Sequence, residues 1–166
     1  MKAIVTGSFD PITIGHMELV KYASERYDTV YVVALVNPEK EYMFTMEQKK
    51  RLIELSVSKF SNVIADAYVG LTADYMQKHG ITQIIRGIRN DKDKEYELNL
   101  ANKMQEFDKS FNTELVLCKD KYSHISSTLV RKCIKDNESL QGLVPNEIIS
   151  EINQILNNYF VKQEVF

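Results

Sequence analysis

The stretch KAIVTGSFDPITIGHMELV, residues 2–20, runs from a short apolar segment through a glycine-bearing loop into a segment with helical spacing. Residues 2–6 have the length and composition of a buried strand. Residues 16–27 place four residues at helical spacing: Met17, Val20, Ala23 and Tyr27. A strand that leads through a loop into a helix is the repeating unit of an α/β fold.

The same alternation continues along the rest of the chain. Further strands are predicted at residues 29–36, 62–68, 83–86 and 114–118. Further helices are predicted from residue 45 towards 60 and at residues 73–79, 91–109, 126–135 and 147–159. Five strands separated by helices predict an α/β fold with a doubly wound, five-stranded parallel sheet, in one domain over residues 1–166.

Local signals support several of these elements. Thr45 and Gln48 have the spacing of a capping box, and Gly80 is suited to end the helix before it. In the helix at 91–109, three residues are expected to form one apolar stripe: Leu98, Ala101 and Met104.

The composition excludes several classes of protein. The net charge is −2 and 27% of the residues are charged, so no overall field attracts nucleic acid or anionic lipid. The longest apolar run, residues 30–36, is too short to span a membrane. Cys118 and Cys133 lack metal or redox spacing and are interpreted as buried thiols. With no signal-peptide pattern at the N-terminus, the expected location is the cytoplasm.

Polar residues follow each of the predicted strands. They lie at residues 7–11, 37–40, 70–72, 86–89 and 119–128. In a doubly wound sheet these segments meet beyond the carboxyl ends of the strands, where ligands bind. Arginine side chains, a lysine and the N–H groups of helix N-termini all favour phosphate oxygens, so this edge is predicted to bind a polyanion.

The predicted phosphate site differs from the most familiar ones. The chain has no GxxxxGK[ST] and no GxGxxG after the first strand. Instead Gly15 allows close approach to the backbone, and His16 stands at a helix start beside it. His16 is expected to donate a hydrogen bond to a nucleotide phosphate as charge develops on that phosphate.

Each of these features also has a purely structural interpretation. A lone histidine at a helix start, such as His16, is more often a cap or a surface residue, and Ser126 to Thr128 alone are more often an N-cap. Arg86 to Arg89 alone can be a solvated turn, and Lys40 alone a surface lysine. Their position after successive strands of one sheet favours the functional interpretation.

Four motifs carry a resemblance to a known family. They are GSFDPITIGH at residues 7–16, PEKEYMFT at 38–45, RGIR at 86–89 followed by Tyr96-Glu97, and ISSTLVR at 125–131. They resemble the nucleotidyltransferases of the HxGH superfamily and, more narrowly, the bacterial phosphopantetheine adenylyltransferases. The resemblance implies a Rossmann-like nucleotidyltransferase fold and transfer of AMP from ATP to 4′-phosphopantetheine, which gives dephospho-coenzyme A and pyrophosphate.

The resemblance also implies roles for individual residues. The implied catalytic residues are His16, Lys40 and Arg89. The implied acceptor-binding residues are Ser8, Lys40, Thr72 and Arg86. The implied ATP-binding residues are Ser8, Phe9, His16, Gly87, Ile88, Arg89, Glu97, Tyr122, Ser123, His124, Ile125, Ser126, Ser127 and Thr128.

The chain departs from the family's usual residues at several positions. Ser8 replaces the commoner Thr, and Thr13 stands where the superfamily has its first histidine, as is usual in this family. Ile14, Thr72 and Tyr122 replace a frequent Asn, Met and Trp. For Thr72 the expected contact is therefore through its backbone.

The family's properties imply further expectations. Magnesium arrives with ATP and has no dedicated protein site, since the sequence lacks HExxH and any carboxylate cluster at ligand spacing. The implied assembly is a homohexamer with coenzyme A as feedback inhibitor, and neither nucleic acid nor membrane is an expected partner. The alternatives are a nicotinate mononucleotide adenylyltransferase and a non-catalytic nucleotide-binding sensor; the former usually keeps the histidine that Thr13 replaces, and the latter needs no His16 or Lys40.

Overall fold

The computed structural model describes the backbone of residues 1–164 and the side chains of residues 1–158, so the last two residues of the expected domain lie outside the described part. Its centre is a five-stranded parallel sheet of β1 (Lys2–Gly7), β2 (Thr29–Val36), β3 (Val63–Val69), β4 (Gln83–Ile88) and β5 (Asn112–Leu117). The strand order is β3-β2-β1-β4-β5. This order confirms the predicted doubly wound topology.

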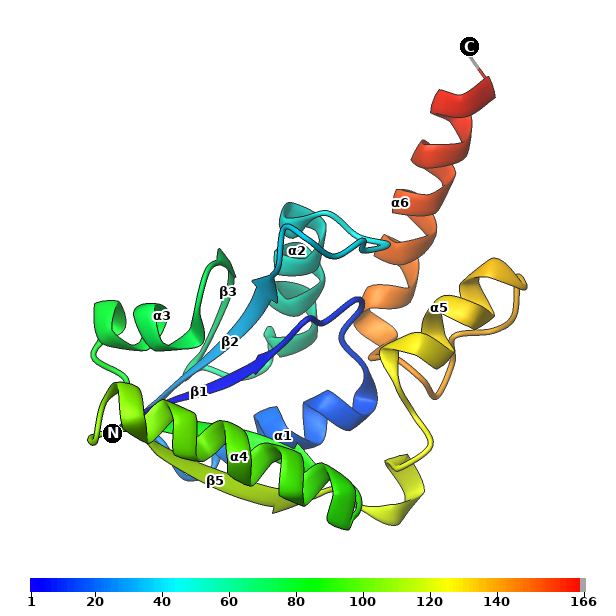
Figure 1. Ribbon diagram of the computed structural model, residues 1–166. Helices are drawn as coiled ribbons and strands as arrows, with labels where there is room; N and C mark the ends of the chain where they lie inside the picture. The colour runs from blue at the N-terminus through cyan, green and yellow to red at the C-terminus, as the bar shows by residue number, and fades with distance from the viewer. Residues whose placement is uncertain (165–166) are drawn as a thin grey trace.

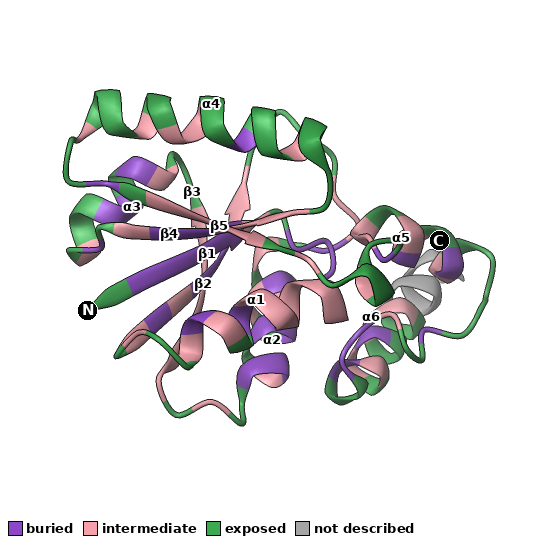
Figure 2. Ribbon diagram, turned by 90° about the horizontal axis from the view of Figure 1, so that it is seen from below, coloured by how far each residue is buried: buried purple, intermediate pink, exposed green. Residues whose placement is uncertain are grey.

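Helices cover both faces of the sheet (Figures 1 and 2). The helices are α1 (Ile14–Ser24), α2 (Met46–Val57), α3 (Thr72–His79), α4 (Asp91–Phe107), α5 (Ser127–Lys135) and α6 (Asn146–Glu164), with one 3₁₀ turn, η1 (Asp120–Tyr122). Helices α1 and α2 pack on one face, and α3 and α4 lie on the other (Figure 2). Helix α6 packs against α2 at its start and then projects away from the sheet (Figure 1).

The core is divided in two by the sheet. On the α1 and α2 face, Val5 and Val32 pack with residues of α2 and α6 such as Leu52 and Ile148. On the α3 and α4 face, the buried set includes Ile4, Val33, Tyr75, Met76, Ile84 and Phe111. Adjacent residues of β1 therefore enter opposite cores, which is why residues 2–6 read as a continuous apolar run.

The predicted helix caps are confirmed. The Thr45 side chain accepts from the backbone of Gln48, and the Gln48 side chain accepts from the backbone of Thr45, which completes the capping box. Gly80 ends α3 in the left-handed conformation with a φ of 63°. The Ser126 hydroxyl accepts from the N–H of Leu129 at the start of α5.

Several predicted boundaries are wrong, and two of them matter for the site. Helix α1 begins at Ile14, two residues before the predicted start, because Thr13 caps it. Strand β4 continues to Ile88 and not to Arg86, because Gly87 and Ile88 pair with Val116 and Leu117 of β5. Two residues expected in a loop are therefore held in the sheet.

The predicted stripe on α4 is confirmed at Ala101 and Met104 and wrong at Leu98. Leu98 is exposed, whereas Glu97 is the buried residue of this helix. The side chains that α4 turns towards the sheet include Leu100, Ala101 and Met104 together with Glu97. The inward face of α4 includes a polar residue, so the spacing of the apolar residues alone does not identify this face correctly.

The topology reverses between β1 and β4. These two strands are neighbours although two strands separate them in the sequence. Ligands of doubly wound sheets bind beyond the strands at this point. In the described part of the chain, no helix has the length and hydropathy that a transmembrane span requires.

Candidate active site

A pocket of about 280 Å³ lies at the carboxyl ends of β1 and β4, at the point where the strand order reverses. Sequence-predicted site residues that line it are Ser8, His16, Arg86, Gly87, Arg89, Tyr122, Ile125, Ser126 and Ser127. The remaining lining residues are Thr6, Gly7, Thr13, Gly15, Leu19, Ile85 and Cys118. None of these side chains is acidic, and two are arginines, so the pocket is suited to an anion.

Other sequence-predicted residues lie elsewhere. Those that do not line this pocket are Phe9, Lys40, Thr72, Ile88, Glu97, Ser123, His124 and Thr128. Phe9 and Glu97 are buried. Lys40 lies in an exposed turn after β2, where its N–H donates to the carbonyl of Asn37. The structure therefore separates the candidate residues into groups with different surroundings.

His16 is part of the helix cap and also lines the pocket. Thr13 caps α1, and its backbone N–H donates to His16 Nδ1 at 3.0 Å. The Thr13 hydroxyl lies 3.1 Å from the same nitrogen. Because Nδ1 accepts from a backbone N–H, a neutral ring carries its proton on Nε2. The two interpretations of this histidine, cap and phosphate ligand, are thus compatible.

The surroundings of His16 favour the neutral ring. Burial lowers the pKa of His16 from 6.5 to about 4, and the charges of Arg89 and Arg86 add to the effect. The ring of Phe9 packs edge-on against the imidazole, with ring centroids 5.0 Å apart. His16 is therefore a neutral hydrogen-bond donor at neutral pH.

The backbone of Phe9 is unusual. Its φ is 41°, in a region that residues other than glycine rarely adopt, and its side chain is buried. A Cβ on Gly7 would lie 3.1 Å from the Phe9 ring, so a glycine is needed where the ring folds back over β1. The GSF turn thus places an aromatic wall beside His16.

Arg86 is held in a fixed orientation by Glu97 of α4. Its Nε and Nη2 donate to the two carboxylate oxygens at 2.8 and 2.7 Å. Its Nη1 donates to the carbonyl and hydroxyl oxygens of Thr6. A two-pronged pair of this kind fixes the plane of the guanidinium. The structure places Glu97 against Arg86 and outside the lining of the first pocket.

A second pocket lies on the opposite side of Arg86, beneath α4. It has a volume of about 180 Å³ and is lined by Thr6, Leu35, Thr72, Ile84, Arg86, Glu97, Leu100, Ala101, Met104 and Thr113. Arg86 and Thr6 line both pockets. Thr72, the first residue of α3, belongs to this second pocket. Its lining is largely apolar, with the ion pair of Arg86 and Glu97 at the junction.

Arg89 follows β4 and is held by a weaker contact. Its Nε donates to Asp93 at 3.2 Å, and about half of its side chain is exposed. The remaining N–H groups of its guanidinium are available to a ligand. The Arg89 side chain is therefore held by fewer hydrogen bonds than that of Arg86, which has three of its nitrogens engaged.

The start of α5 offers backbone donors. The Ser127 hydroxyl donates to the carbonyl of Pro11, and the Thr128 hydroxyl oxygen accepts from Arg131. The Ser127 hydroxyl thus connects α5 to the loop after β1. The first N–H groups of a helix have no backbone partner within it, so those that no side chain caps are suited to an anion.

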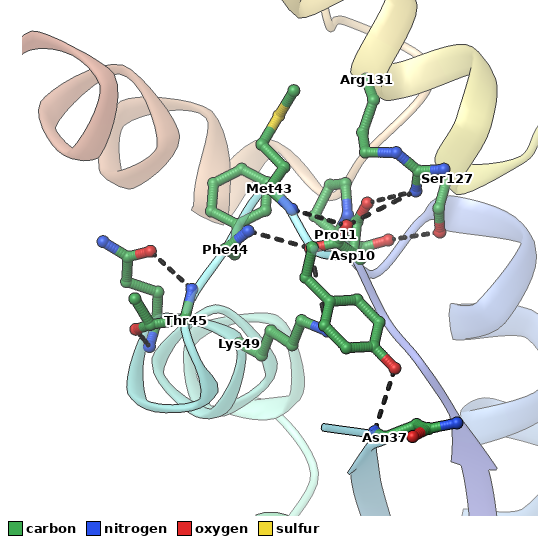
Figure 3. Close-up of polar contacts among 11 residues, drawn as sticks. Asp10, Pro11, Asn37, Met43, Phe44, Thr45, Lys49, Ser127 and Arg131 are labelled. Atoms are coloured by element: carbon green, nitrogen blue, oxygen red, sulfur yellow. Dashed lines mark hydrogen bonds and ion pairs between the residues drawn. The ribbon is translucent and has the colours of Figure 1, made fainter. Parts of the chain in front are cut away.

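Sequence reasoning missed a charged cluster in which the buried Asp10 and Lys49 meet the partly exposed Arg131 (Figure 3). Asp10 is part of the GSFDP motif, and Lys49 lies four residues after the Thr45 cap. The Lys49 side chain is fully buried, and its Nζ lies 3.8 Å from Asp10. A lysine in a polar helix segment gives no sign of burial in the sequence.

Few of the side chains that line the pocket are of the kinds that form a metal centre. The described residues contain no group of three or more histidine, cysteine or acidic side chains placed to share a metal ion. Mg²⁺ on a nucleotide keeps phosphate oxygens and water as ligands and needs few protein ligands. The hydroxyl-lined, carboxylate-free pocket fits a metal that is held by the nucleotide itself.

Comparison with known proteins agrees with this geometry. The cytidylyltransferase-like family model matches residues 4–133. A phosphopantetheine adenylyltransferase of Clostridium novyi is 41% identical over 150 residues, which cover 90% of this chain and 93% of that protein. Proteins of the same name from Clostridium tetani and Bdellovibrio bacteriovorus are 36% and 38% identical, over 94% and 89% of this chain and 98% and 92% of their own. The chain therefore belongs to the cytidylyltransferase-like family and, within it, to the phosphopantetheine adenylyltransferases.

Proposed function

We propose that this protein transfers the adenylyl group of ATP to 4′-phosphopantetheine, giving dephospho-coenzyme A and pyrophosphate. The observation that carries the proposal is the position of Arg86 between two pockets. A reaction that joins two phosphates needs two binding sites that share one point of contact. Arg86 is a fixed positive charge at such a point.

In this proposal the first pocket binds ATP. His16, Arg89 and the N–H groups at the start of α5 all face the phosphates. Ser8, Gly87 and the segment from Tyr122 to Ser127 complete the nucleotide site. Phe9 supports His16 from behind and offers its backbone.

The second pocket is proposed to bind the acceptor. Its apolar side chains suit the pantetheine arm, and Arg86 binds the acceptor phosphate at the junction. Thr72 contributes at the start of α3. Glu97 is proposed to orient Arg86, in contrast to the direct role in ATP binding that the family resemblance implies.

The reaction needs no general base. The acceptor phosphate has a second pKa of about 6, so it is largely ionised at neutral pH. One of its oxygens attacks the α-phosphorus in line, and pyrophosphate leaves. His16 donates its Nε2 proton in a hydrogen bond to the α-phosphoryl oxygens as charge develops there. One such donor is worth about 3 kcal/mol of barrier, or roughly a hundredfold in rate.

Lys40 and Arg89 are proposed to assist His16. Both side chains are solvent-accessible, so both are free to move onto bound phosphates. Lys40 would contact the α-phosphoryl group and the acceptor, and Arg89 the β- and γ-phosphates. Mg²⁺ that arrives with ATP would neutralise charge on the leaving pyrophosphate.

The test is pyrophosphate release in the presence of ATP and Mg²⁺ with three acceptor conditions: 4′-phosphopantetheine, nicotinate mononucleotide and none. Release with 4′-phosphopantetheine alone is the expected result. Release with the mononucleotide alone would support adenylyl transfer from ATP but contradict the assignment of Arg86 and Thr72 to a 4′-phosphopantetheine site. No release from folded protein in any condition would favour the non-catalytic sensor.

Further proposals rest on the family. We propose that residues 1–166 form one nucleotidyltransferase domain, which the single continuous sheet supports. We also propose a homohexamer in the cytoplasm, where its substrates occur, with feedback inhibition by coenzyme A. Sedimentation analysis tests the homohexamer, and inhibition of pyrophosphate release by added coenzyme A tests the feedback.

A further inference from the structure

Asp10 is a buried carboxylate to which several segments of the chain converge (Figure 3). Its Oδ2 accepts from the N–H of Met43 at 2.9 Å, and its Oδ1 accepts from the N–H of Phe44 at 3.0 Å. Met43 and Phe44 belong to the loop that connects β2 to α2, the same loop that carries Lys40. One carboxylate thus receives two successive backbone donors of this loop.

The same carboxylate is connected to α5. The Arg131 Nη1 lies 3.7 Å from Asp10 Oδ2 and donates to the Asp10 carbonyl at 2.8 Å. The Arg131 Nη2 donates to the hydroxyl of Thr128 in the first turn of α5. Figure 3 also shows Ser127 reaching the neighbouring Pro11. The first turn of α5 is therefore tied to residues 10 and 11.

Lys49 adds a second link to the loop. Its ammonium has no hydrogen-bond partner among the residues that the structure describes. It lies 3.8 Å from Asp10 Oδ1 and 3.2 Å from the centre of the Tyr42 ring. The Tyr42 hydroxyl in turn accepts from the N–H of Asn37 at the end of β2. The positive charge of Lys49 thus lies between Asp10 and the aromatic side chain that holds the start of the loop.

We propose that Asp10 is a positioning residue for the reaction: through Met43, Phe44 and Arg131 it fixes the loop of residues 37–45 relative to the start of α5. This inference rests on the proposed function, because the loop delivers Lys40 to the substrates and α5 provides the phosphate-binding N–H groups. Asp10 itself touches no reacting atom. Burial of a charge between two basic side chains makes the arrangement rigid, since any displacement leaves a charge unpaired.

Asp10→Asn tests the proposal with little change in shape. Met43 and Phe44 donate to different oxygens of Asp10, so an amide in the same orientation places its NH₂ group against one of these N–H donors and loses that bond. We expect turnover to fall by about tenfold to a hundredfold, as misplaced groups do, with little change in the KM for ATP. Hydrogen exchange of the backbone amides in residues 37–45 is expected to accelerate.

A second variant separates positioning from stability. Asp10→Asn leaves the Lys49 charge without its anion, which lowers the melting temperature. The double variant Asp10→Asn with Lys49→Met removes that charge, so the melting temperature is expected to recover while turnover stays low and exchange in residues 37–45 stays fast. Recovery of turnover together with stability would show that Asp10 is only structural, and it would overturn the proposal.

Asp66→Asn is the matched control. Asp66, like Asp10, forms an ion pair with a lysine, Lys50, and accepts from a backbone N–H, that of Ala67, but it lies on the edge strand β3. Its loss is expected to lower the melting temperature without changing turnover. Unchanged turnover and exchange in Asp10→Asn would also overturn the proposal.

These results remain distinguishable from a failure of the proposed function. If the unaltered protein releases no pyrophosphate, the adenylyl-transfer assignment fails, and the exchange measurement alone decides the inference. Fast exchange of residues 37–45 in both Asp10 variants, but not in Asp66→Asn, would support the coupling. Equal exchange in all four proteins would overturn it.

Discussion

At the scale of single residues, the imidazole of His16 has its protonation and tautomer set before any substrate binds. The Thr13 N–H holds Nδ1 as an acceptor, and burial with two nearby arginines lowers the pKa to about 4. A neutral donor adds no charge to the pocket and can still stabilise negative charge that develops on a bound group. The backbone N–H of Thr13 sets the tautomer of the imidazole, and the Phe9 ring packs against it.

We expect the His16 ring to remain neutral, with its proton on Nε2, from pH 8 down to about pH 5. Nitrogen-15 chemical shifts of the ring across this range are the measurement. Because the folded pKa lies below the unfolded value of about 6.5, the stability contribution is complete above pH 6.5 and is lost as the pH falls towards 4. A titration midpoint near 6.5 in the folded protein would contradict this description.

His16→Ala is expected to reduce turnover by about a hundredfold or more while the affinity for ATP changes little, because the contact is strongest in the transition state. Single-turnover rates and calorimetric ATP binding give the two quantities. Thr13→Val is the control: it keeps the backbone N–H bond and loses the hydroxyl, so a smaller loss is expected. If ATP affinity collapsed and turnover per bound complex did not, His16 would be a binding residue only.

At the scale of elements, β4 and α4 together present Arg86. The strand provides the arginine, and the helix provides Glu97, the buried residue of α4, to orient it. The arginine at the end of this strand was predicted from the sequence. For its partner Glu97 the family resemblance implies a role in ATP binding, and the RGIR and Tyr96-Glu97 motifs alone do not show that this carboxylate pairs with Arg86.

Glu97→Gln is expected to raise the KM for 4′-phosphopantetheine by about tenfold and to leave the KM for ATP nearly unchanged, because a neutral amide no longer holds both prongs of Arg86. Asp93→Asn is the matched control, since Asp93 pairs with Arg89 and its loss should act on ATP. Steady-state kinetics with each substrate varied in turn provide the values. An effect of Glu97→Gln on ATP alone would support the direct nucleotide role implied by the family.

The elements themselves were largely predictable. Apolar runs, the Thr45 capping box and Gly80 mark strands and helix ends with chemistry that is local to the sequence. The extension of β4 to Ile88 was not predictable, because it depends on pairing with β5, about thirty residues further along the chain. Boundaries set by non-local hydrogen bonds leave no local signal.

At the scale of the whole molecule, the two cores hold segments that are far apart in sequence. The pocket forms where β1, β4, α1 and α5 meet, and a parallel sheet with four crossovers predicts that meeting. The charged cluster of Asp10, Lys49 and Arg131 could not be predicted, because each residue is unremarkable in its own segment. Only the tertiary structure shows that all three meet in one place.

Lys49 is expected to give the protein a distinctive dependence of stability on pH. Burial lowers its pKa from 10.5 to about 8, with Asp10 opposing and Arg131 adding to the shift. Between these values the unfolded chain binds a proton that the folded protein does not, so this residue's contribution to the free energy of unfolding increases as the pH rises from 8 to 10.5. The free energy of unfolding, measured with urea at several pH values in this window, should depend on pH differently in the unaltered protein and in Lys49→Met. Parallel curves would contradict the assignment.

The central claim is that the acceptor phosphate, fixed at Arg86, attacks the α-phosphorus of ATP. The most direct test follows label from α- or γ-labelled ATP during a single turnover with 4′-phosphopantetheine, with pantetheine, which lacks the phosphate, as control. We expect the α-label in dephospho-coenzyme A, the γ-label in pyrophosphate, and no transfer to pantetheine. Transfer of the γ-label to either acceptor, or equal transfer of the α-label to pantetheine, would contradict the account.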